Sequence, residues 1–316
     1  MQNISASRKK PLTQRIAREL RKNYVLYLLI LLPLAVLIVF QYVPMYGVQI
    51  AFRDYKVARG ITGSKWVGLK YIKKFFDSPM AGTYIWNTLA ISLYELCTFP
   101  LGLVLALLLN YVPSARFRKT VQMVSYAPHF ISTVVMCGMI TQFLDARSGL
   151  INVLLRYVGV QPRNWMTYPE YFRHIYVWSG VWQGLGYSSI IYIAALSGVS
   201  PELHEAAIVD GANIFQRMWN VDIPSVLPTF CILLIMRCGS IMSVGFEKVL
   251  LLQNNLNKSA SEIISTFTYN IGLNSSGAMP QYSYGAAIGL FTSLVNMVLL
   301  LVVNTVTKKL SGSGLW

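Results

Sequence analysis

The sequence predicts an all-α integral membrane protein that crosses the bilayer six times. Of its 316 residues, 54% are hydrophobic and 12% are charged, against roughly 25% charged in an average soluble protein. The mean hydropathy is +0.49. Six apolar runs reach the length of about 20 residues that a transmembrane helix needs. So much apolar surface exceeds what a soluble domain of this length can bury.

The first predicted span covers residues 24–45 and contains no charged residue. At 1.5 Å per residue, such a helix is about 33 Å long, which is enough to cross the hydrocarbon core. It follows a basic segment, but no small-residue cleavage site closes the run. We therefore interpret it as an anchor and not as a cleaved signal. The other five predicted spans cover residues 84–112, 121–144, 175–197, 226–250 and 284–306.

The distribution of basic residues predicts that both termini are cytoplasmic. Residues 1–23 hold seven Lys or Arg, and the short link between the second and third spans adds Arg116, Arg118 and Lys119. Such residues are enriched in cytoplasmic loops. Residues 46–83 also carry seven basic residues and would face outward, so the two sides nearly balance. We give the short segments more weight. With this orientation, residues 24–306 form the transmembrane domain, and its loop at about residues 200–225 lies in the cytoplasm. The C-terminal tail, residues 307–316, is also cytoplasmic.

The net charge of +15 does not indicate nucleic-acid binding. The basic residues lie at the ends of apolar runs, where they are ordinary membrane anchors, and no aromatic-basic stripe accompanies them. No residues cluster into a metal site, a catalytic triad or a pair of carboxylates. We expect the cysteines to pack as small apolar side chains, because all four fall inside apolar runs without C-x-x-C spacing: Cys97, Cys137, Cys231 and Cys238.

The segment from Ser200 to Pro228 is amphipathic and lies between the fourth and fifth predicted spans. Ser200 suits a helix cap and Pro201 suits the first helical position. Gly211 supplies a backbone that is free to turn, and a second short amphipathic stretch, residues 214–221, follows it. The pattern predicts two short helices arranged in an L at the membrane surface. By itself, it fits a simple connector between two spans equally well.

The same segment resembles the EAA signature of permease subunits in binding-protein-dependent ABC importers. The stretch EAAIVDGA is followed by a phenylalanine, by IP and by a further proline. Other stretches, among them YVPMYGVQIAFRDYK, PHFIS and SVGFEKVLLL, are similar to the oligosaccharide and polysaccharide branch of these maltose-permease-like proteins. Ser243 stands where that branch more often has asparagine. The residues that match the signature are Glu205, Ala206, Ala207, Asp210, Gly211, Ala212, Phe215, Ile223, Pro224 and Pro228.

This resemblance implies a type I ABC importer permease fold, in which the loop of residues 200–225 is the coupling helix element. In that family the loop docks in a groove of a separate ATP-binding subunit. The resemblance implies that Gly211 forms the bend of the loop and that Glu205 makes a polar contact with the ATPase. The chain has no G-x-x-x-x-G-K-[ST] loop, so ATP and Mg are expected on the partner and no cofactor on this chain.

The resemblance further implies a transport subunit rather than an enzyme. The expected function is sugar import, with oligosaccharides or related sugars as the substrate. The implied partners are a second permease subunit that forms a heterodimer, two ATP-binding cassette subunits and an extracellular sugar-binding protein. The expected location is a bacterial cell membrane.

Candidates for the substrate path come from polar and aromatic residues inside the spans. Charges in spans are costly and usually face a cavity or the bundle interior, so we predict that Glu95 and Arg237 pair or line one cavity. A structural lock between two spans explains them equally well. A sugar site also needs aromatic faces and hydrogen-bonding groups. The candidates are Glu95, Tyr126, His129, Trp182, Gln183, Tyr187 and Arg237.

Two alternatives stay open at this stage. A secondary transporter would show an inverted repeat and paired broken helices, and no second copy of the Ser200–Pro228 pattern is evident in the sequence. An ABC importer permease for a non-sugar solute would share the same signature, and only the similarity to the sugar branch argues against it.

Overall fold

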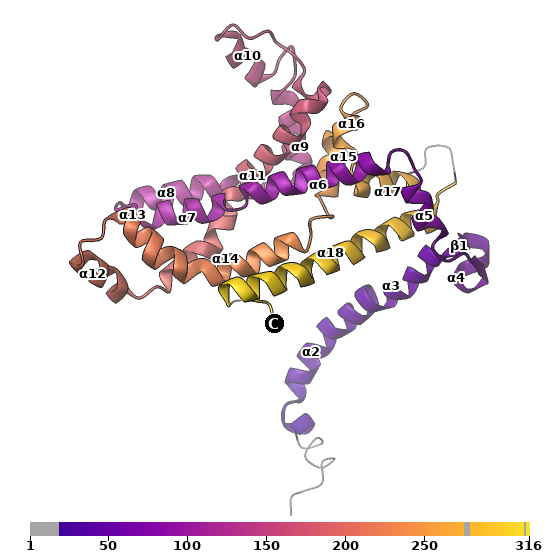
Figure 1. Ribbon diagram of the computed structural model, residues 1–316, viewed down its shortest axis with the longest axis horizontal. Helices are drawn as coiled ribbons and strands as arrows, with labels where there is room; N and C mark the ends of the chain where they lie inside the picture. The colour runs from indigo at the N-terminus through magenta and orange to yellow at the C-terminus, as the bar shows by residue number, and fades with distance from the viewer. Residues whose placement is uncertain (1–18, 275–278, 313) are drawn as a thin grey trace, which may run out of the picture.

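The computed structural model describes residues 19–274, 279–312 and 314–316. This part of the chain is an elongated bundle of helices (Figure 1). The helices that run along its long axis are α6 (Ala81–Thr98), α7 (Leu101–Asn110), α8 (Ala115–Tyr126), α11 (Pro169–Ser197), α14 (Ile223–Cys238) and α18 (Tyr282–Ser311).

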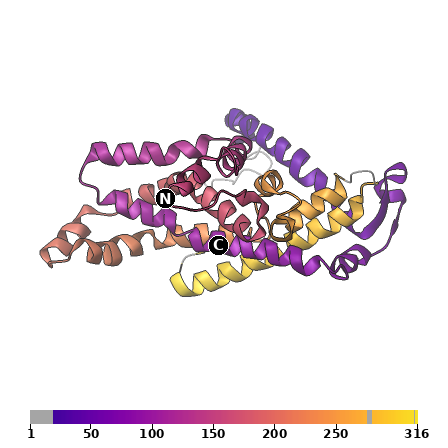
Figure 2. The same cartoon turned by 90° about the horizontal axis from the view of Figure 1, so that it is seen from above.

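The first part of the N-terminal helix lies apart from this bundle, whereas its last segment, residues 46–52, packs against α18. The helix begins as α2 (Tyr24–Leu37) and continues through η1 (Ile38–Tyr42), α3 (Val43–Met45) and η2 (Tyr46–Phe52). In Figures 1 and 2 its first part splays away from the other long helices. Its apolar side chains are exposed along the whole length of α2. In a membrane, this surface faces either lipid or another protein chain.

The helices confirm the predicted all-α membrane architecture. Four stretches are long and apolar enough to cross a bilayer: Tyr24–Phe52, Ala81–Asn110, Ile214–Cys238 and Tyr282–Lys309. The pair Ala115–Phe130 and Thr133–Phe143 is a further candidate. Helix α11 is 29 residues long, so it has the length to cross, but many of its residues are Trp, Tyr, Ser and Gly.

The chain turns sharply inside the third predicted span. Helix α8 passes into η4 (Ala127–Phe130), and α9 (Thr133–Phe143) leaves at an angle of 98°. Pro128 lies within η4 and cannot donate a backbone hydrogen bond. Ser132 then caps α9, because its side chain accepts from the Val135 N–H at 3.4 Å. Figure 1 shows α9 leaving the bundle toward α10 (Leu150–Arg156).

The predicted span over residues 226–250 is wrong at its C-terminal end. The continuous helix that contains its first part runs from Ile214 to Cys238 and so includes the second short helix of the predicted loop. Arg237 is therefore in its last turn and not in its middle. Residues 239–245 form turns and extended chain, because two glycines and two serines interrupt the apolar run. Helical structure resumes in α15 (Phe246–Leu252), α16 (Lys258–Ser261) and α17 (Ile264–Gly272).

Helix α11 is the central element of the bundle and packs against α7, α8, α14 and α16. Small residues allow these helices to approach closely. A Cβ atom at Gly186 would collide with the backbone of Ser125 on α8, and one at Gly102 on α7 would collide with the Ser188 side chain. Close approach through small residues is the usual way in which transmembrane helices pack. The position of α11 fixes the walls of any path through the bundle.

A small antiparallel sheet lies at one end of the bundle. Strands β1 (Arg53–Lys56) and β2 (Ser64–Trp66) pair through Arg53 opposite Trp66, with η3 (Val57–Arg59) and α4 (Gly60–Gly63) between them. The Tyr71 hydroxyl donates to Asp54 at 2.7 Å and so ties the sheet to α5 (Lys70–Phe76). This hydrogen bond lowers the pKa of Asp54, whereas burial and the same bond raise the pKa of Tyr71 to about 12.

Candidate functional site

The cytoplasmic loop of the prediction forms at the end of the bundle opposite the sheet (Figure 1). It contains α12 (Pro201–Val209), α13 (Ile214–Arg217) and η6 (Met218–Asp222). Ser200 caps α12, because its side chain accepts from the Glu202 N–H at 3.3 Å. Pro201 follows at the first helical position, where its missing N–H has no helical partner to lose. The expected first helix is therefore present with the expected cap.

Gly211 makes the bend between the two short helices. Its φ is +78°, in the left-handed region that costs other residues about 1–2 kcal/mol. The Gly211 N–H donates to the Ile208 carbonyl at 3.0 Å, and the Ala212 N–H donates to the Ala207 carbonyl at 2.9 Å. These two bonds satisfy carbonyls that the helix end would leave free. Nothing lies within 4 Å of a Cβ placed on Gly211, so the backbone angle alone requires glycine here.

A reciprocal cap starts the second short helix. The Asn213 side chain accepts from the Gln216 N–H at 2.9 Å, and the Gln216 side chain accepts from the Asn213 N–H at 2.8 Å. This capping box fixes the direction in which the chain leaves the bend. The loop therefore has a defined shape from the end of α11 to the start of α14.

Asp222 fastens the loop to the bundle, and no sequence pattern pointed to it. Its side chain is fully buried at the end of η6. The Tyr111 hydroxyl, at the end of α7, donates to Asp222 Oδ2 at 2.6 Å. His204 Nε2, on α12, lies 3.2 Å from Asp222 Oδ1. Burial, together with the bond to Asp222, raises the pKa of Tyr111. One carboxylate thus joins three helical elements.

The outer surface of the loop is exposed and partly apolar. Phe215 is 78% exposed and Val209 is 87% exposed. A patch of this kind on a membrane protein marks a contact with another protein or with the membrane surface. Of the signature residues, Ala207, Ala212 and Ile223 are half-buried. Those at the exposed surface are Glu205, Ala206, Asp210, Gly211, Phe215, Pro224 and Pro228.

The two charges of the predicted spans form an ion pair. A terminal guanidinium nitrogen of Arg237, on α14, donates to Glu95 Oε2, on α6. The Arg237 side chain is 43% exposed and that of Glu95 is 22% exposed. Both line a cavity of about 310 Å³ together with Gly180, Gly184 and Ser188 of α11. The predicted pairing is therefore present, and it borders open space.

Lys248 is a third charge at the same place, and our inspection of the spans did not single it out. It lies on α15, is buried, and donates to the Tyr176 carbonyl on α11 at 2.6 Å. Its ammonium lies 4.5 Å from the centroid of the Tyr176 ring. A Cβ on Gly180, which lines the cavity, would be 3.2 Å from Lys248 Nζ. A signal was available, because residue 248 falls inside the apolar run predicted as residues 226–250.

The other substrate-path candidates make different contacts. His129, next to the bend after α8, stacks on Tyr187 with ring centroids 3.8 Å apart. Gln183 donates to the Ile131 carbonyl at 2.8 Å and so satisfies a backbone group that the same bend leaves free. Trp182 is 51% exposed on α11. Tyr126 ends α8 and is half-buried. None of these five candidates lines the Glu95–Arg237 cavity among the described residues.

The described residues hold no group of three or more His, Cys, Asp or Glu side chains that could bind a metal ion. The two features with functional geometry are therefore the loop anchored by Asp222 and the charged cavity. Helix α11 connects them, since it lines the cavity and leads directly into α12. This combination defines the class of the protein, a multi-pass membrane permease with a rigid loop at one end.

Comparison with known proteins assigns the family. Residues 98–312 match the binding-protein-dependent transport system inner membrane component, and the chain belongs to that family. It is 38% identical to the polygalacturonan/rhamnogalacturonan transport system permease protein YteP of Bacillus subtilis (strain 168), over 98% of this chain and 95% of that one. It is 39% identical to the protein LplB of the same strain, over 94% of this chain and 92% of that one.

A solved structure shares the fold over nearly the whole chain. It is a chain of a bacterial alginate ABC transporter in complex with an alginate pentasaccharide-bound periplasmic protein. The TM-score is 0.86 at 34% sequence identity, covering 95% of this chain and all of that one. The chain is thus an inner-membrane permease subunit of a carbohydrate ABC transporter. Its relatives are transport subunits and not enzymes.

The Glu95–Arg237 pair can be tested by exchanging its charges. We expect Glu95→Arg and Arg237→Glu each to reduce transport and the amount of protein in the membrane, because each leaves two like charges facing one another in an apolar setting. The double exchange should recover a large part of both losses. The measurement is uptake per mole of membrane-inserted protein. A double variant no better than the worse single variant would show that direct pairing is unimportant.

Proposed function

We propose that this chain is the channel-forming subunit of an ATP-driven importer that moves oligosaccharides across a bacterial cell membrane. The loop of residues 200–225 would receive motion from a separate ATPase and pass it to the spans. The observation that carries this proposal is the anchoring of the loop by Asp222, together with its exposed apolar surface.

The connections of the loop explain how motion would reach the cavity. Helix α11, which lines the cavity, ends at Ser197, close to the start of α12 at Pro201. At the other end of the loop, η6 runs directly into α14, which carries Arg237. The Tyr111–Asp222 bond links the loop to α7, which follows α6 and its Glu95. A push on this rigid loop would therefore move three walls of one cavity.

The exposed charges support a second permease subunit as a partner. Arg237 is nearly half-exposed in a single chain, and an arginine facing lipid at that depth would be costly. The cavity face would therefore meet water or another subunit, and α2 offers further uncovered apolar surface. The full proposal adds two ATP-binding subunits that hold ATP and Mg, an extracellular sugar-binding protein, and both termini in the cytoplasm.

Gly211 tests the coupling role of the loop. We expect Gly211→Val to keep insertion and assembly but to separate ATP hydrolysis from uptake, because a β-branched residue resists a φ of +78°. The matched control is Gly211→Asn, since asparagine tolerates the left-handed region and should retain most of the coupling. The measurement is the rate of uptake against the rate of ATP hydrolysis in vesicles. Normal uptake by the Gly211→Val variant would contradict a coupling role for the loop.

The charges around the cavity favour an acidic oligosaccharide as the substrate. Arg237 and Glu95 pair in the cavity wall, and Lys248 lies buried beside Gly180 of that wall, so the three charges together leave one excess positive charge. A carboxylate on a sugar would offset that charge in a setting where water is scarce. Among the relatives, one solved transporter imports the acidic polysaccharide alginate, and YteP belongs to a polygalacturonan/rhamnogalacturonan transport system.

A comparison of oligogalacturonides with their methyl esters tests whether the transporter selects its substrate by charge, because the two have similar shapes and differ in charge. We expect the assembled transporter to prefer the free acid over the methyl ester by about tenfold in competition for uptake, which corresponds to about 1.4 kcal/mol. Arg237→Gln should narrow that preference by removing one positive charge from the cavity wall. Equal competition by acid and ester in the unaltered protein would exclude acidic selectivity and leave general sugar transport standing.

A further inference from the structure

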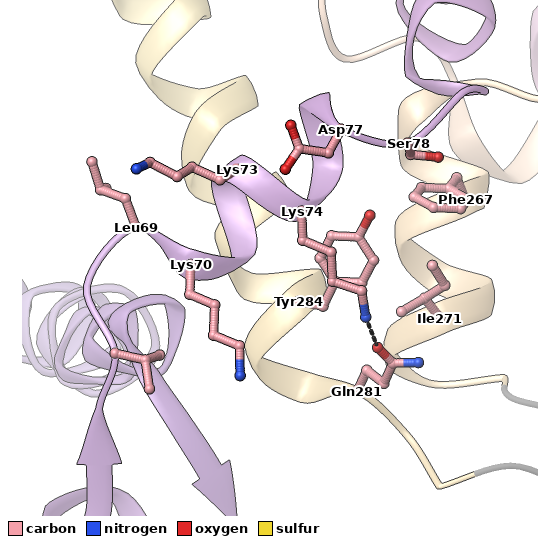
Figure 3. A pocket seen from close by; sticks show the side chains of 11 residues that line it. Leu69, Lys70, Lys73, Lys74, Asp77, Ser78, Phe267, Ile271, Gln281 and Tyr284 are labelled. Carbon is pink, nitrogen blue, oxygen red and sulfur yellow. Dashed lines mark hydrogen bonds between the residues drawn. The ribbon is translucent and has the colours of Figure 1, made fainter.

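A large cavity lies at the end of the bundle opposite the α12–α13 loop. It has a volume of about 1120 Å³ and is bordered by α5, α17 and the start of α18 (Figure 3). Three lysines of α5 line it, namely Lys70, Lys73 and Lys74. Opposite them are the amide of Gln281 and the ring of Tyr284. We refer to this cavity as the lysine pocket.

The lysines of this pocket carry more positive charge than nearby carboxylates offset, although Lys70 lies near enough to Asp54 to help lower the pKa of that carboxyl. In the part of the chain that the structure describes, no Asp or Glu forms an ion pair with any of the three. Lys74 Nζ donates to Gln281 Oε1 at 2.9 Å and lies 4.6 Å from the centroid of the Tyr284 ring. Asp77 is the single carboxylate in the lining, and all three lysines are exposed. The pocket therefore presents an excess of positive charge.

The pocket lies at the level of lipid headgroups. Tyr284 begins the uncharged apolar run of α18, so it marks the edge of the hydrocarbon core, and Lys74 contacts it there. Leu69 is 54% exposed and Phe76 is 51% exposed on either side of the lysines. Basic side chains at this depth with exposed apolar neighbours match a molecule that has an anionic head and an apolar tail.

We propose that the lysine pocket binds the phosphate of an anionic phospholipid, in the leaflet on the side opposite the α12–α13 loop. Lys70 and Lys74 hold the phosphate, with Lys74 oriented by Gln281 and Tyr284, and Lys73 adds positive charge at the rim. Leu69 and Phe76 receive the start of the acyl chains. A bound anionic lipid also accounts for three of the seven basic residues between positions 46 and 83, on the side where membrane proteins usually carry fewer.

The binding of phosphatidylglycerol to the full chain in micelles tests this proposal, with phosphatidylcholine as the uncharged comparison and native mass spectrometry as the readout. Replacing Lys70, Lys73 and Lys74 with Gln should weaken phosphatidylglycerol binding by about 10- to 100-fold, since each basic residue near an anionic surface contributes about 1 kcal/mol. The matched control replaces Lys56, Arg59 and Lys65 with Gln. This removes three exposed positive charges from the same end but outside the pocket. It should change binding less than twofold or so.

Replacing the three pocket lysines with Arg keeps the charge and should retain binding, which guards against a folding defect in the Gln variant. Equal losses in the two triple-Gln variants would overturn the proposal, because general basicity would then explain the binding. Equal retention of phosphatidylcholine and phosphatidylglycerol would also overturn it. So would displacement of bound phosphatidylglycerol by a soluble oligogalacturonide, which would make the pocket a sugar site.

Discussion

The buried carboxylate of Asp222 is the interaction on which the functional geometry depends. A carboxylate without solvent must be compensated, and the Tyr111 hydroxyl does this by donating to Asp222 Oδ2, while the His204 ring of α12 lies 3.2 Å from Oδ1, which has no hydrogen-bond partner among the described residues. Their positions fix α12 against the ends of α7 and α14. Without this anchor, the capped helices and the Gly211 bend would keep their local shape, but the loop would lose its link to α7 and keep only its covalent connections to α11 and α14.

The charged side chains at the cavity are also compensated by partners from other helices. Arg237 and Glu95 satisfy one another, while Lys248 is held by a helix carbonyl and an aromatic ring. Gly180 leaves room for the Lys248 ammonium and also borders the cavity. Charges of this kind cost stability in a bilayer and persist where a polar ligand or water needs them. The same helices thus form the walls of the cavity and connect to the loop.

Local patterns in the sequence were enough to predict much of this arrangement. The Ser200 cap, the Gly211 bend and the Glu95–Arg237 pair follow from residue types whose physical preferences are strong. The break after Cys238 was missed because hydropathy averages over a few small polar residues. Asp222 and Lys248 were missed because their partners, Tyr111 and Tyr176, lie far away in sequence. The contact that Gln183 makes was not predicted, because its side chain donates to a carbonyl at a bend that only the fold reveals.

The most direct test of the account is the number of ATP molecules hydrolysed per sugar imported by the assembled transporter carrying Asp222→Asn. Asparagine keeps the shape but removes the charge, and hydrogen bonds to charged groups contribute about 1.5–3 kcal/mol each. We predict that this ratio rises about tenfold or more while assembly is retained, with Tyr111→Phe giving a smaller rise. An unchanged ratio in a fully assembled Asp222→Asn transporter would contradict the claim that this carboxylate couples the loop to the spans.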